Sequence, residues 1–251
     1  MNLSAHTLLI RLAGPMQSWG TQSRFTDRDT GLEPSKSGVI GLLCAALGRP
    51  RSEPVDDLAA LRMAVRVDRE GSHAVDFHTT GGGRFMGKPY GVQKSDGKVP
   101  GEKTGSKFTV LSRRHYLADA FFIVALESPD KRLLEQLDHA LDSPHWPLYL
   151  GRKSFTPGLP VRLPGGLIEN TRLEDALRSW PWSPPPRTRD DNLPARLRVV
   201  LDAEPGTGGQ ARTDVPLSFE KRSFTTRFVA TDWLETADLP KGGDPLCISP
   251  A

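Results

Sequence analysis

The chain has 251 residues, of which 37% are hydrophobic, so it can bury a core in one large domain or in two small ones. Its 24 glycines and 22 prolines indicate short elements joined by many loops, and a net charge of +3 indicates a polyanion partner only if the basic residues cluster. The distant cysteines Cys44 and Cys247, and the lack of a long apolar segment, predict a cytoplasmic protein with reduced thiols and exclude a disulfide framework and a membrane span.

The N-terminal part predicts a strand, a helix and a second strand. Residues 6–13 form an apolar run, as in a strand from the middle of a sheet. The helix that follows is apolar nearly all round, which predicts burial; it is expected to begin at Ser35 or Ser37 and to end at Gly48. Residues 61–68 alternate apolar and polar side chains, which is typical of a strand with one solvent-exposed face.

A second unit of the same kind follows. Residues 113–127 predict one strand, residues 128–142 a helix capped near Ser128, and residues 147–153 a returning strand. Two such units in series predict an α+β, ferredoxin-like (RRM-like) core of the βαββαβ type within residues 1–155. Such a core has two helices on one face of an antiparallel sheet and leaves the other face free to bind.

The segment between the two units, residues 81–107, has almost no apolar side chains. Its length and composition predict a projecting hairpin or a mobile loop. A solvated loop and a polyanion-binding loop are both compatible with its regularly spaced lysines. These lysines are Lys88, Lys94, Lys98, Lys103 and Lys107.

Residues 156–251 predict a smaller, β-rich C-terminal region. Thr171 and Glu174 are spaced as a capping box ahead of a short amphipathic helix. A proline cluster ends this helix, and residues 195–204 predict a strand. The tail that follows interleaves aromatic residues with arginine and lysine.

The chain lacks the usual motifs of cofactor chemistry. Its histidines are scattered, no phosphate loop or dinucleotide fingerprint occurs, and we therefore expect no metal and no cofactor. The pair His115 and Tyr116 is the best catalytic candidate, because a histidine and a tyrosine can cleave RNA without a metal. Neighbouring residues of a strand point to opposite faces, however, so a structural or RNA-contacting role is the alternative.

Basic, polar and aromatic residues gather at the ends of the predicted strands. Basic side chains bind phosphates and aromatic rings stack on unpaired bases, which is the usual chemistry of single-stranded RNA recognition. Trp19 is compatible with either of two roles, stacking on a base or wedging its loop against the core. The strand-end residues are Gln17, Ser18, Trp19, Arg113, Arg114, Tyr116, Arg152, Lys153 and Ser154.

Five stretches, in this order, carry a family resemblance: "RLAGPMQSWG", "SGVIGLLCAALG", "DFHTT", "RHYLADAFFIVAL" and "YLGRKSFTP". Together they resemble the CasD family, the 5′-handle-binding subunit of type I-E CRISPR Cascade in the RAMP superfamily. The resemblance implies a ferredoxin-like core, a lysine-bearing thumb hairpin at about residues 81–107 and a small C-terminal domain.

The resemblance also implies a function in antiviral defence. Such a subunit grips the 5′ handle of CRISPR RNA, caps the filament of backbone subunits and lies near the large subunit, while target DNA is read by base pairing with the guide. The implied protein is not an enzyme; the alternative is a metal-independent endoribonuclease that processes precursor CRISPR RNA. The motifs place Ser35, Lys36 and Ser37 beside the handle, where helix amides can receive a phosphate, together with the strand-end residues, of which Arg114 is the strongest candidate.

Overall fold

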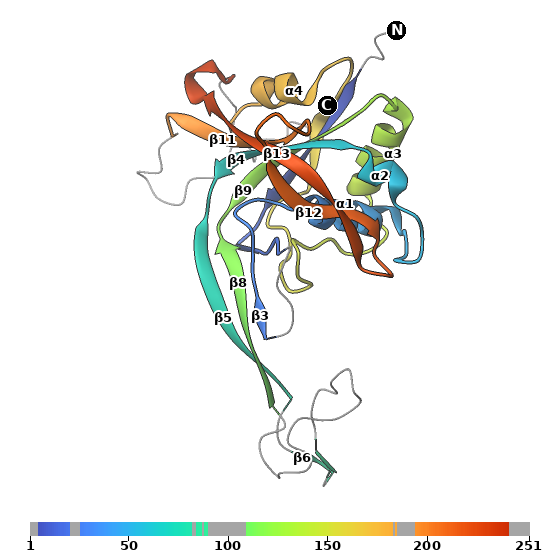
Figure 1. Ribbon diagram of the computed structural model, residues 1–251, viewed down its shortest axis with the longest axis vertical. Coiled ribbons are helices and arrows are strands. Elements are labelled where there is room, and N and C mark those ends of the chain that lie inside the picture. The colour runs from blue at the N-terminus through green and yellow to red at the C-terminus, as the bar shows by residue number, and fades with distance from the viewer. Residues whose placement is uncertain are drawn as a thin grey trace.

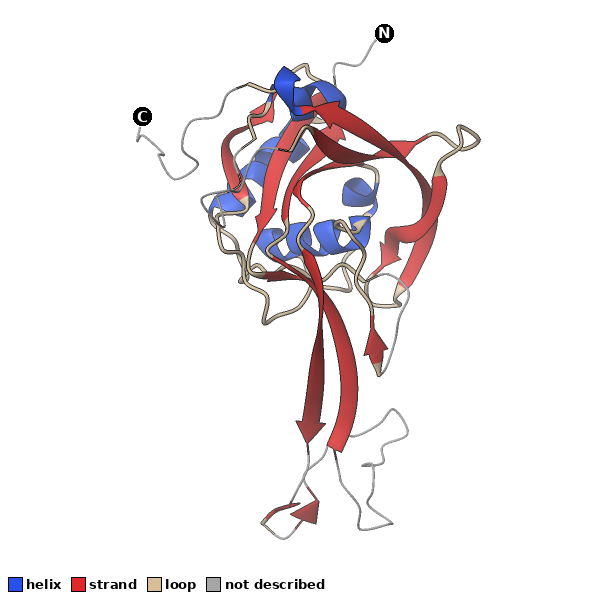
Figure 2. Ribbon diagram, turned by 90° about the vertical axis from the view of Figure 1, so that its left-hand side faces the viewer, coloured by secondary structure: helices blue, strands red, loops and turns tan. Residues whose placement is uncertain are grey.

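The computed structural model describes residues 5–20, 26–81, 84–86, 88–89, 109–182, 184 and 194–240. It is a mixed α+β protein in which a large sheet carries helices on both faces, and a long two-stranded arm leaves this body (Figures 1 and 2). None of the helices in this part of the chain is long and apolar enough to cross a membrane.

The large sheet has seven strands and joins the two ends of the chain. All neighbouring strands in it are antiparallel. The strands from residue 196 onward attach to the N-terminal strands through β11, so the sheet has no break at residue 155. Their spatial order is β10 (Arg162–Ile168), β1 (His6–Ala13), β9 (Phe121–Ser128), β4 (Arg62–Arg69), β11 (Arg196–Ala203), β13 (Ser223–Glu235) and β12 (Gln210–Ser218).

Helices cover both faces of this sheet. α1 (Lys36–Leu47) and α3 (Lys131–Asp142) pack with β1, β4 and β9 in the larger hydrophobic core, while α2 (Asp56–Ala59) is a single turn beside it. α4 (Leu173–Ser179) packs on the opposite face in a second core. The expectation that one face stays free is therefore wrong, and the continuous apolar run of β1 reflects burial on both sides.

Two polar side chains of β4, those of Arg66 and Asp68, do not face water either. Arg66 is fully buried, and its Nε donates to Asp68 Oδ1 over 2.7 Å. Its Nη1 donates to the carbonyl oxygens of Leu177 and Trp180, at the C-terminal end of α4. The predicted exposed face of this strand is thus wrong, because the alternating pattern comes from a buried ion pair that also binds the end of a helix.

The ends of α1 follow the sequence prediction. Ser35 is the N-cap, and its Oγ accepts a hydrogen bond from the Gly38 amide over 3.3 Å. Gly48 ends the helix with φ of 73°, the left-handed conformation that favours glycine. The other two helix starts differ from prediction.

α3 is capped by Asp130 and not by Ser128; the Asp130 carboxylate accepts from the amides of Arg132 and Leu133. At α4 the expected capping box is absent, because the Thr171 hydroxyl donates to the Glu169 carbonyl oxygen. There the amide of Leu173 donates to the Glu127 carboxylate on β9, the strand on which this helix packs.

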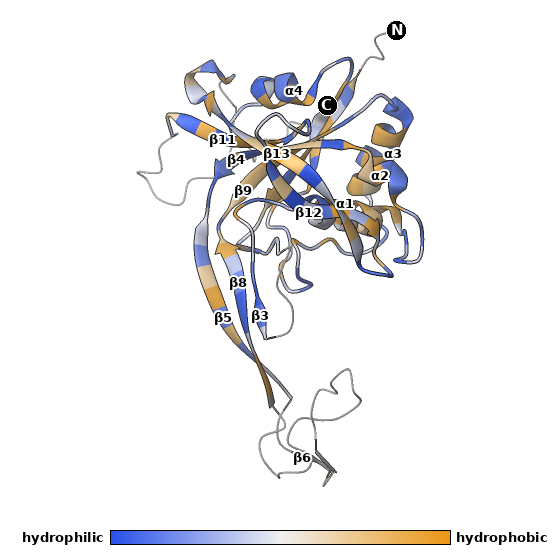
Figure 3. Cartoon of the chain, viewed as in Figure 1, coloured by the Kyte–Doolittle hydropathy of each residue, from blue (hydrophilic) through white to orange (hydrophobic). Residues whose placement is uncertain are grey.

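The predicted strand 113–127 is in fact two strands in different sheets. The chain bends at Asp119, which has φ of 55°, between β8 (Thr109–Ala118) and β9. β8 pairs along its whole length with β5 (Ser72–Gly81), a strand that the sequence pattern did not reveal, and the two form the arm. β2 (Met16–Gln17) and β3 (Asp27–Arg28) add to β8 near the body. Hydrophilic residues predominate along β3 and the middle of β8 (Figure 3).

The predicted returning strand 147–153 is a loop, and β10 takes its place in the sheet. The backbone of this loop turns sharply at Gly151, which has φ of 89°. Near the far end of the arm, β6 (Arg84–Phe85) pairs with β7 (Lys88–Pro89). The first predicted thumb lysine, Lys88, is therefore part of β7. The other four predicted thumb lysines, Lys94, Lys98, Lys103 and Lys107, lie outside the described residues.

Cys44 is buried in α1 as a free thiol, and burial raises its pKa to about 11. In a Cys247→Ser variant, we expect the folded protein to react with iodoacetamide at pH 8 about 100-fold more slowly than an ordinary cysteine of pKa about 8.5, because the thiolate is the reactive form. The reaction is followed by mass spectrometry, with the urea-unfolded protein as control. Equal rates in the folded and unfolded proteins would contradict this burial.

Candidate nucleic-acid interface

An open polar groove of about 680 Å³ lies at the start of α1. Segments far apart in the sequence meet there: the loop after β2, β3, the loop around residue 151 and the turn between β12 and β13. The groove is lined by Ser18, Trp19, Gly20, Arg28, Asp29, Ser35, Ser37, Gly38, Gly151, Arg152, Phe219, Arg222 and Phe224.

Two predicted contacts in the first loop, Gln17 and Trp19, have buried side chains. Gln17 Nε2 donates to the carbonyl oxygens of Leu12 and Ala120 over 3.1 and 2.8 Å. Its Oε1 accepts from Trp19 Nε1 over 3.2 Å, and the Trp19 ring packs against Gly38 at the start of α1. Both residues are 1% exposed or less. Trp19 is therefore the wedge that anchors the loop, and Gln17 provides hydrogen-bond partners for the buried indole N–H and the two carbonyl oxygens.

Ser18 joins this loop to the loop around Gly151. Its amide donates to the Leu150 carbonyl oxygen over 3.1 Å, and its hydroxyl donates to the His115 carbonyl oxygen over 3.2 Å. A Cβ atom on Gly151 would lie 1.7 Å from the Ser18 carbonyl oxygen. The two loops therefore meet so closely that this position requires glycine.

The start of α1 is already engaged by the C-terminal strands. The amide of Lys36 donates to Asp214 Oδ2 over 2.8 Å, and its ammonium group is 3.3 Å from Asp202 Oδ2. The Lys36 side chain is buried, so it does not reach the groove as predicted. Ser35 is occupied as the N-cap, which leaves Ser37 as the residue of this predicted trio with a partly exposed side chain at the groove.

Three arginines concentrate positive charge beside the groove. Burial, followed by the charges of Arg114 and Arg28, lowers the pKa of Arg152. Burial and the charge of Arg28 likewise lower the pKa of Arg114, whose Nε donates to Ser112 Oγ over 3.0 Å. Burial is the largest cause of both shifts and the neighbouring guanidinium charges add to it, while the Asp76 carboxylate opposes both. The positive charges of the three arginines favour an anion bound among them.

Arg152 also holds the site together. Its Nη2 donates to the carbonyl oxygens of His115 and Arg28 over 2.9 and 3.3 Å, and its guanidinium carbon lies 5.4 Å from the centre of the Phe155 ring. Its Nη1 is buried and has no hydrogen-bond partner within the described part of the chain. The neighbouring predicted residues Lys153 and Ser154 are exposed, as is Arg113 on β8.

His115 and Tyr116 do not come together. His115 Nε2 lies 3.1 Å from Asp27 Oδ1, and its Nδ1 lies 3.2 Å from His73 Nε2. The Tyr116 ring instead packs against Phe155, with ring centres 5.8 Å apart. The two side chains lie on opposite faces of β8, as the alternation of a strand requires. Among the described residues, no group of three or more His, Cys, Asp or Glu side chains is placed to hold a metal ion.

Several groove residues were not among the sequence predictions. Arg28 follows residues with no clear strand pattern, while Phe219, Arg222 and Phe224 come from the β12–β13 turn, about two hundred positions after the first loop. The interleaving of aromatic and basic residues in the tail indicates a binding segment, but nothing in this pattern predicts that the tail folds back onto α1.

The structure thus defines an α+β protein with a cationic groove beside the base of a projecting two-stranded arm. Residues 7–230 match the family model described as CRISPR-associated protein (Cas_Cas5), and the chain belongs to this family. This confirms the resemblance drawn from the five sequence stretches.

Individual relatives agree with this assignment. The chain is 35% identical to the CRISPR system Cascade subunit CasD of Escherichia coli (strain K12) over 161 residues, which are 59% of this chain and 65% of that protein. It is similar to a structure titled "Crystal structure of Cas protein", with 43% identity, a TM-score of 0.71 and coverage of 94% of this chain and 98% of that one. A chain of a structure titled "CRISPR RNA-guided surveillance complex" is 34% identical, with a TM-score of 0.74 and coverage of 96% and 95%.

Proposed function

We propose that the chain is a non-catalytic subunit of a type I-E Cascade surveillance complex and that its groove binds the 5′ handle of CRISPR RNA. The observation that carries the proposal is the position of Arg28 and Arg152 in the lining of the groove, with Arg114 beside them, where three positive charges favour an RNA phosphate. The unpartnered Nη1 of Arg152 would gain an acceptor in the same step. The CasD relative and the surveillance-complex structure support this function for a chain so similar in sequence and fold.

The core of the fold is proposed to be ferredoxin-like. Support comes from the strand order β10-β1-β9-β4, in which each of the two strand–helix–strand units encloses a strand of the other. In this arrangement α1 and α3 are the two crossover helices, and β11 to β13 extend the sheet beyond the core.

The proposed partners follow from this role. The subunit caps the filament of backbone subunits, and its arm, formed by β5 and β8, corresponds to the thumb that lies over guide RNA next to the neighbouring backbone subunit. The large subunit docks nearby, and target DNA is contacted indirectly through guide pairing. The complex acts in the cytoplasm in antiviral defence.

The alternative function is metal-independent cleavage of precursor CRISPR RNA. One observation favours it: His115 lies between Asp27 and His73, and such a chain of groups can relay a proton. The position of Tyr116 favours the non-catalytic proposal. Its ring packs on the core, on the face of β8 opposite to His115, so it cannot act together with that histidine.

Arg114→Ala is expected to weaken binding of handle RNA about tenfold and to lower the log–log salt slope by about 0.7, since one phosphate contact is lost. Arg114 is preferred to Arg152 for this test, because Arg152 also holds two backbone carbonyl groups. Fluorescence anisotropy at several salt concentrations measures both quantities. Arg132→Ala, an exposed arginine on α3 outside the groove, is the matched control. Equal affinities of the two variants would argue against the site.

A cleavage assay on the complete repeat RNA tests the alternative. The purified chain should leave repeat RNA intact in EDTA, with gel electrophoresis as the measurement. Specific cleavage that disappears in His115→Ala would establish the nuclease and overturn the non-catalytic proposal.

A further inference from the structure

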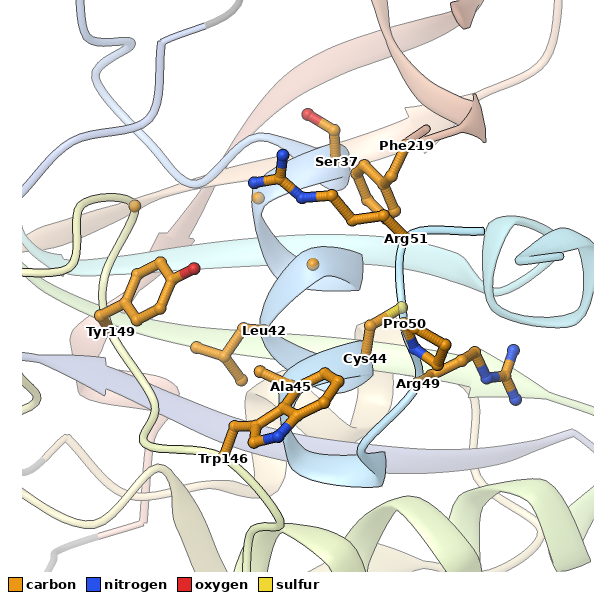
Figure 4. Close-up of a pocket in the computed structure, with 13 residues that line it drawn as sticks. Ser37, Leu42, Cys44, Ala45, Arg49, Pro50, Arg51, Trp146, Tyr149 and Phe219 are labelled. Carbon is orange, nitrogen blue, oxygen red and sulfur yellow. The ribbon is translucent and has the colours of Figure 1, made fainter. Parts of the chain in front are cut away.

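The cationic groove continues into a second cavity of about 430 Å³ along α1 (Figure 4). The two share Ser37, Gly38, Gly151 and Phe219, so a ligand can extend from one into the other. The second cavity is lined by Ser37, Gly38, Gly41, Leu42, Cys44, Ala45, Arg49, Pro50, Arg51, Trp146, Tyr149, Gly151 and Phe219.

The floor of this cavity is the part of α1 that carries three of its small residues. Gly38, Gly41 and Ala45 follow one another at spacings of three and four residues, so they share one face of α1. The small side chains leave the helix surface open to a flat group. A Cβ atom on Gly41 would be in ordinary contact, 3.7 Å from the Phe219 ring, so the space beside the helix is narrow.

The walls are aromatic and come from two distant segments. Trp146 and Tyr149 belong to the loop after α3, and Phe219 belongs to the β12–β13 turn (Figure 4). Trp146 is 42% exposed, although exposure of a large apolar ring to water is energetically unfavourable. An aromatic side chain held open at the edge of a cavity is available to stack on a ligand.

The charges around the cavity favour an anionic ligand. Its lining includes Arg49 and Arg51 and no carboxylate. Arg49 forms an ion pair with Asp57, with 2.6 Å between Nη1 and Oδ1. Arg51 is exposed and forms no ion pair within the described residues. At the other end, the shared residues lead to the arginines of the groove. An apolar peptide would use the aromatic walls but would gain nothing from these cations.

We infer that this cavity binds an unpaired nucleobase of the RNA whose phosphates lie in the cationic groove, with Trp146 stacking on the base. The inference rests on the proposed RNA-binding function and adds the position of a base. Stacking between a base and an aromatic side chain is a common source of affinity for single strands, and the Tyr149 and Ser37 hydroxyl groups can hydrogen-bond to the base edge.

The test uses a set of handle RNAs in which one base at a time is replaced by an abasic ribose, so every phosphate remains. We expect one abasic position to weaken binding to the full-length chain about tenfold and Trp146→Ala to weaken binding of the intact RNA by a similar factor. In Trp146→Ala, the same abasic position should have no further effect, because the stacking partner is already absent. The salt dependence should be unchanged in this variant.

Two further variants protect the result from a folding artefact. Gly41→Leu fills the cavity from its floor and raises helix propensity, but its side chain must displace the Phe219 ring, so circular dichroism first verifies its fold. The folded variant should lose the same tenfold affinity. Trp233→Ala removes an exposed tryptophan on β13 outside the cavity and should bind like the wild type.

The outcomes separate the two proposals. One outcome is that handle RNA binds, but the ratio of wild-type to Trp146→Ala affinity is the same for every abasic RNA. The phosphate site then stands and the base pocket is wrong. The cavity would then be better assigned to a protein segment. If the wild-type chain does not bind handle RNA at all, the proposed function fails and the base pocket fails with it.

Discussion

Replacing Asp214 with alanine is expected to lower the free energy of unfolding by about 3–5 kcal/mol, the usual effect of removing one partner from a buried ion pair. The Asp214 side chain is 1% exposed, and its two oxygens accept from Arg227 Nε and Nη2 over 2.7 and 2.9 Å. The same carboxylate accepts from the Lys36 amide at the start of α1. It therefore joins the C-terminal strands to the helix that forms the groove.

The expected loss is large because the remaining charges do not balance. Arg227 and Lys36 would share a single carboxylate, that of Asp202, in a buried setting where burial already lowers the pKa of Lys36. Urea denaturation followed by circular dichroism gives the free energy of unfolding. Asp232→Ala is the matched control, since it removes an exposed carboxylate from β13. A midpoint for Asp214→Ala equal to that of the control would contradict the structural role of this network.

Gly151→Ala is the second substitution with a large expected effect. Alanine must adopt the left-handed conformation at φ of 89°, and its Cβ would lie 1.7 Å from the Ser18 carbonyl oxygen. Because backbone cannot move as a flexible side chain can, the two loops must separate. We expect the free energy of unfolding to fall by about 3 kcal/mol, from backbone strain and overpacking together, and handle RNA affinity to fall with it.

Gly165→Ala distinguishes the two causes. Gly165 also has a left-handed φ, of 75°, but nothing lies within 4 Å of an added Cβ atom. This control should lose only the conformational part, about 1 kcal/mol, and should bind RNA normally. If the two variants are equally stable and bind equally well, the close contact between the loops does not shape the groove.

The parts of the fold that the sequence predicts are those determined by local signals. The β1 strand begins and ends where its apolar run does, and α1 has a serine N-cap and a left-handed glycine at its end. Both features depend on a few neighbouring residues.

The errors occur where tertiary structure changes the meaning of a pattern. Alternation in β4 predicts an exposed face, yet Arg66 is buried against α4, which comes about a hundred residues later. The segment from residue 113 to 127 has strand-forming residues throughout, and only the bend at Asp119 divides it between two sheets. The sequence pattern does not reveal which polar residue faces solvent and which forms an ion pair in the interior.

The candidate site shows the same division. Three predicted segments, around Ser18, Ser37 and Arg152, do meet at one groove. The family motifs also place Gln17 and Lys36 there, but the hydrogen bonds of these side chains turn them into the protein. Phe219 and Arg222 could not be placed, since their approach to α1 depends on the pairing of β11 with β4.

The central claim, that the groove holds the RNA handle, is tested most directly by photo-crosslinking. Handle RNA that carries thiouridine is irradiated with the full-length chain, and mass spectrometry locates the modified peptides. We predict adducts on peptides that contain Arg28, Arg152 and Phe219, lost in competition with unmodified handle RNA but not with an unrelated RNA. Adducts confined to α4 and the outer face of β11, or equal competition by both RNAs, would contradict the assignment.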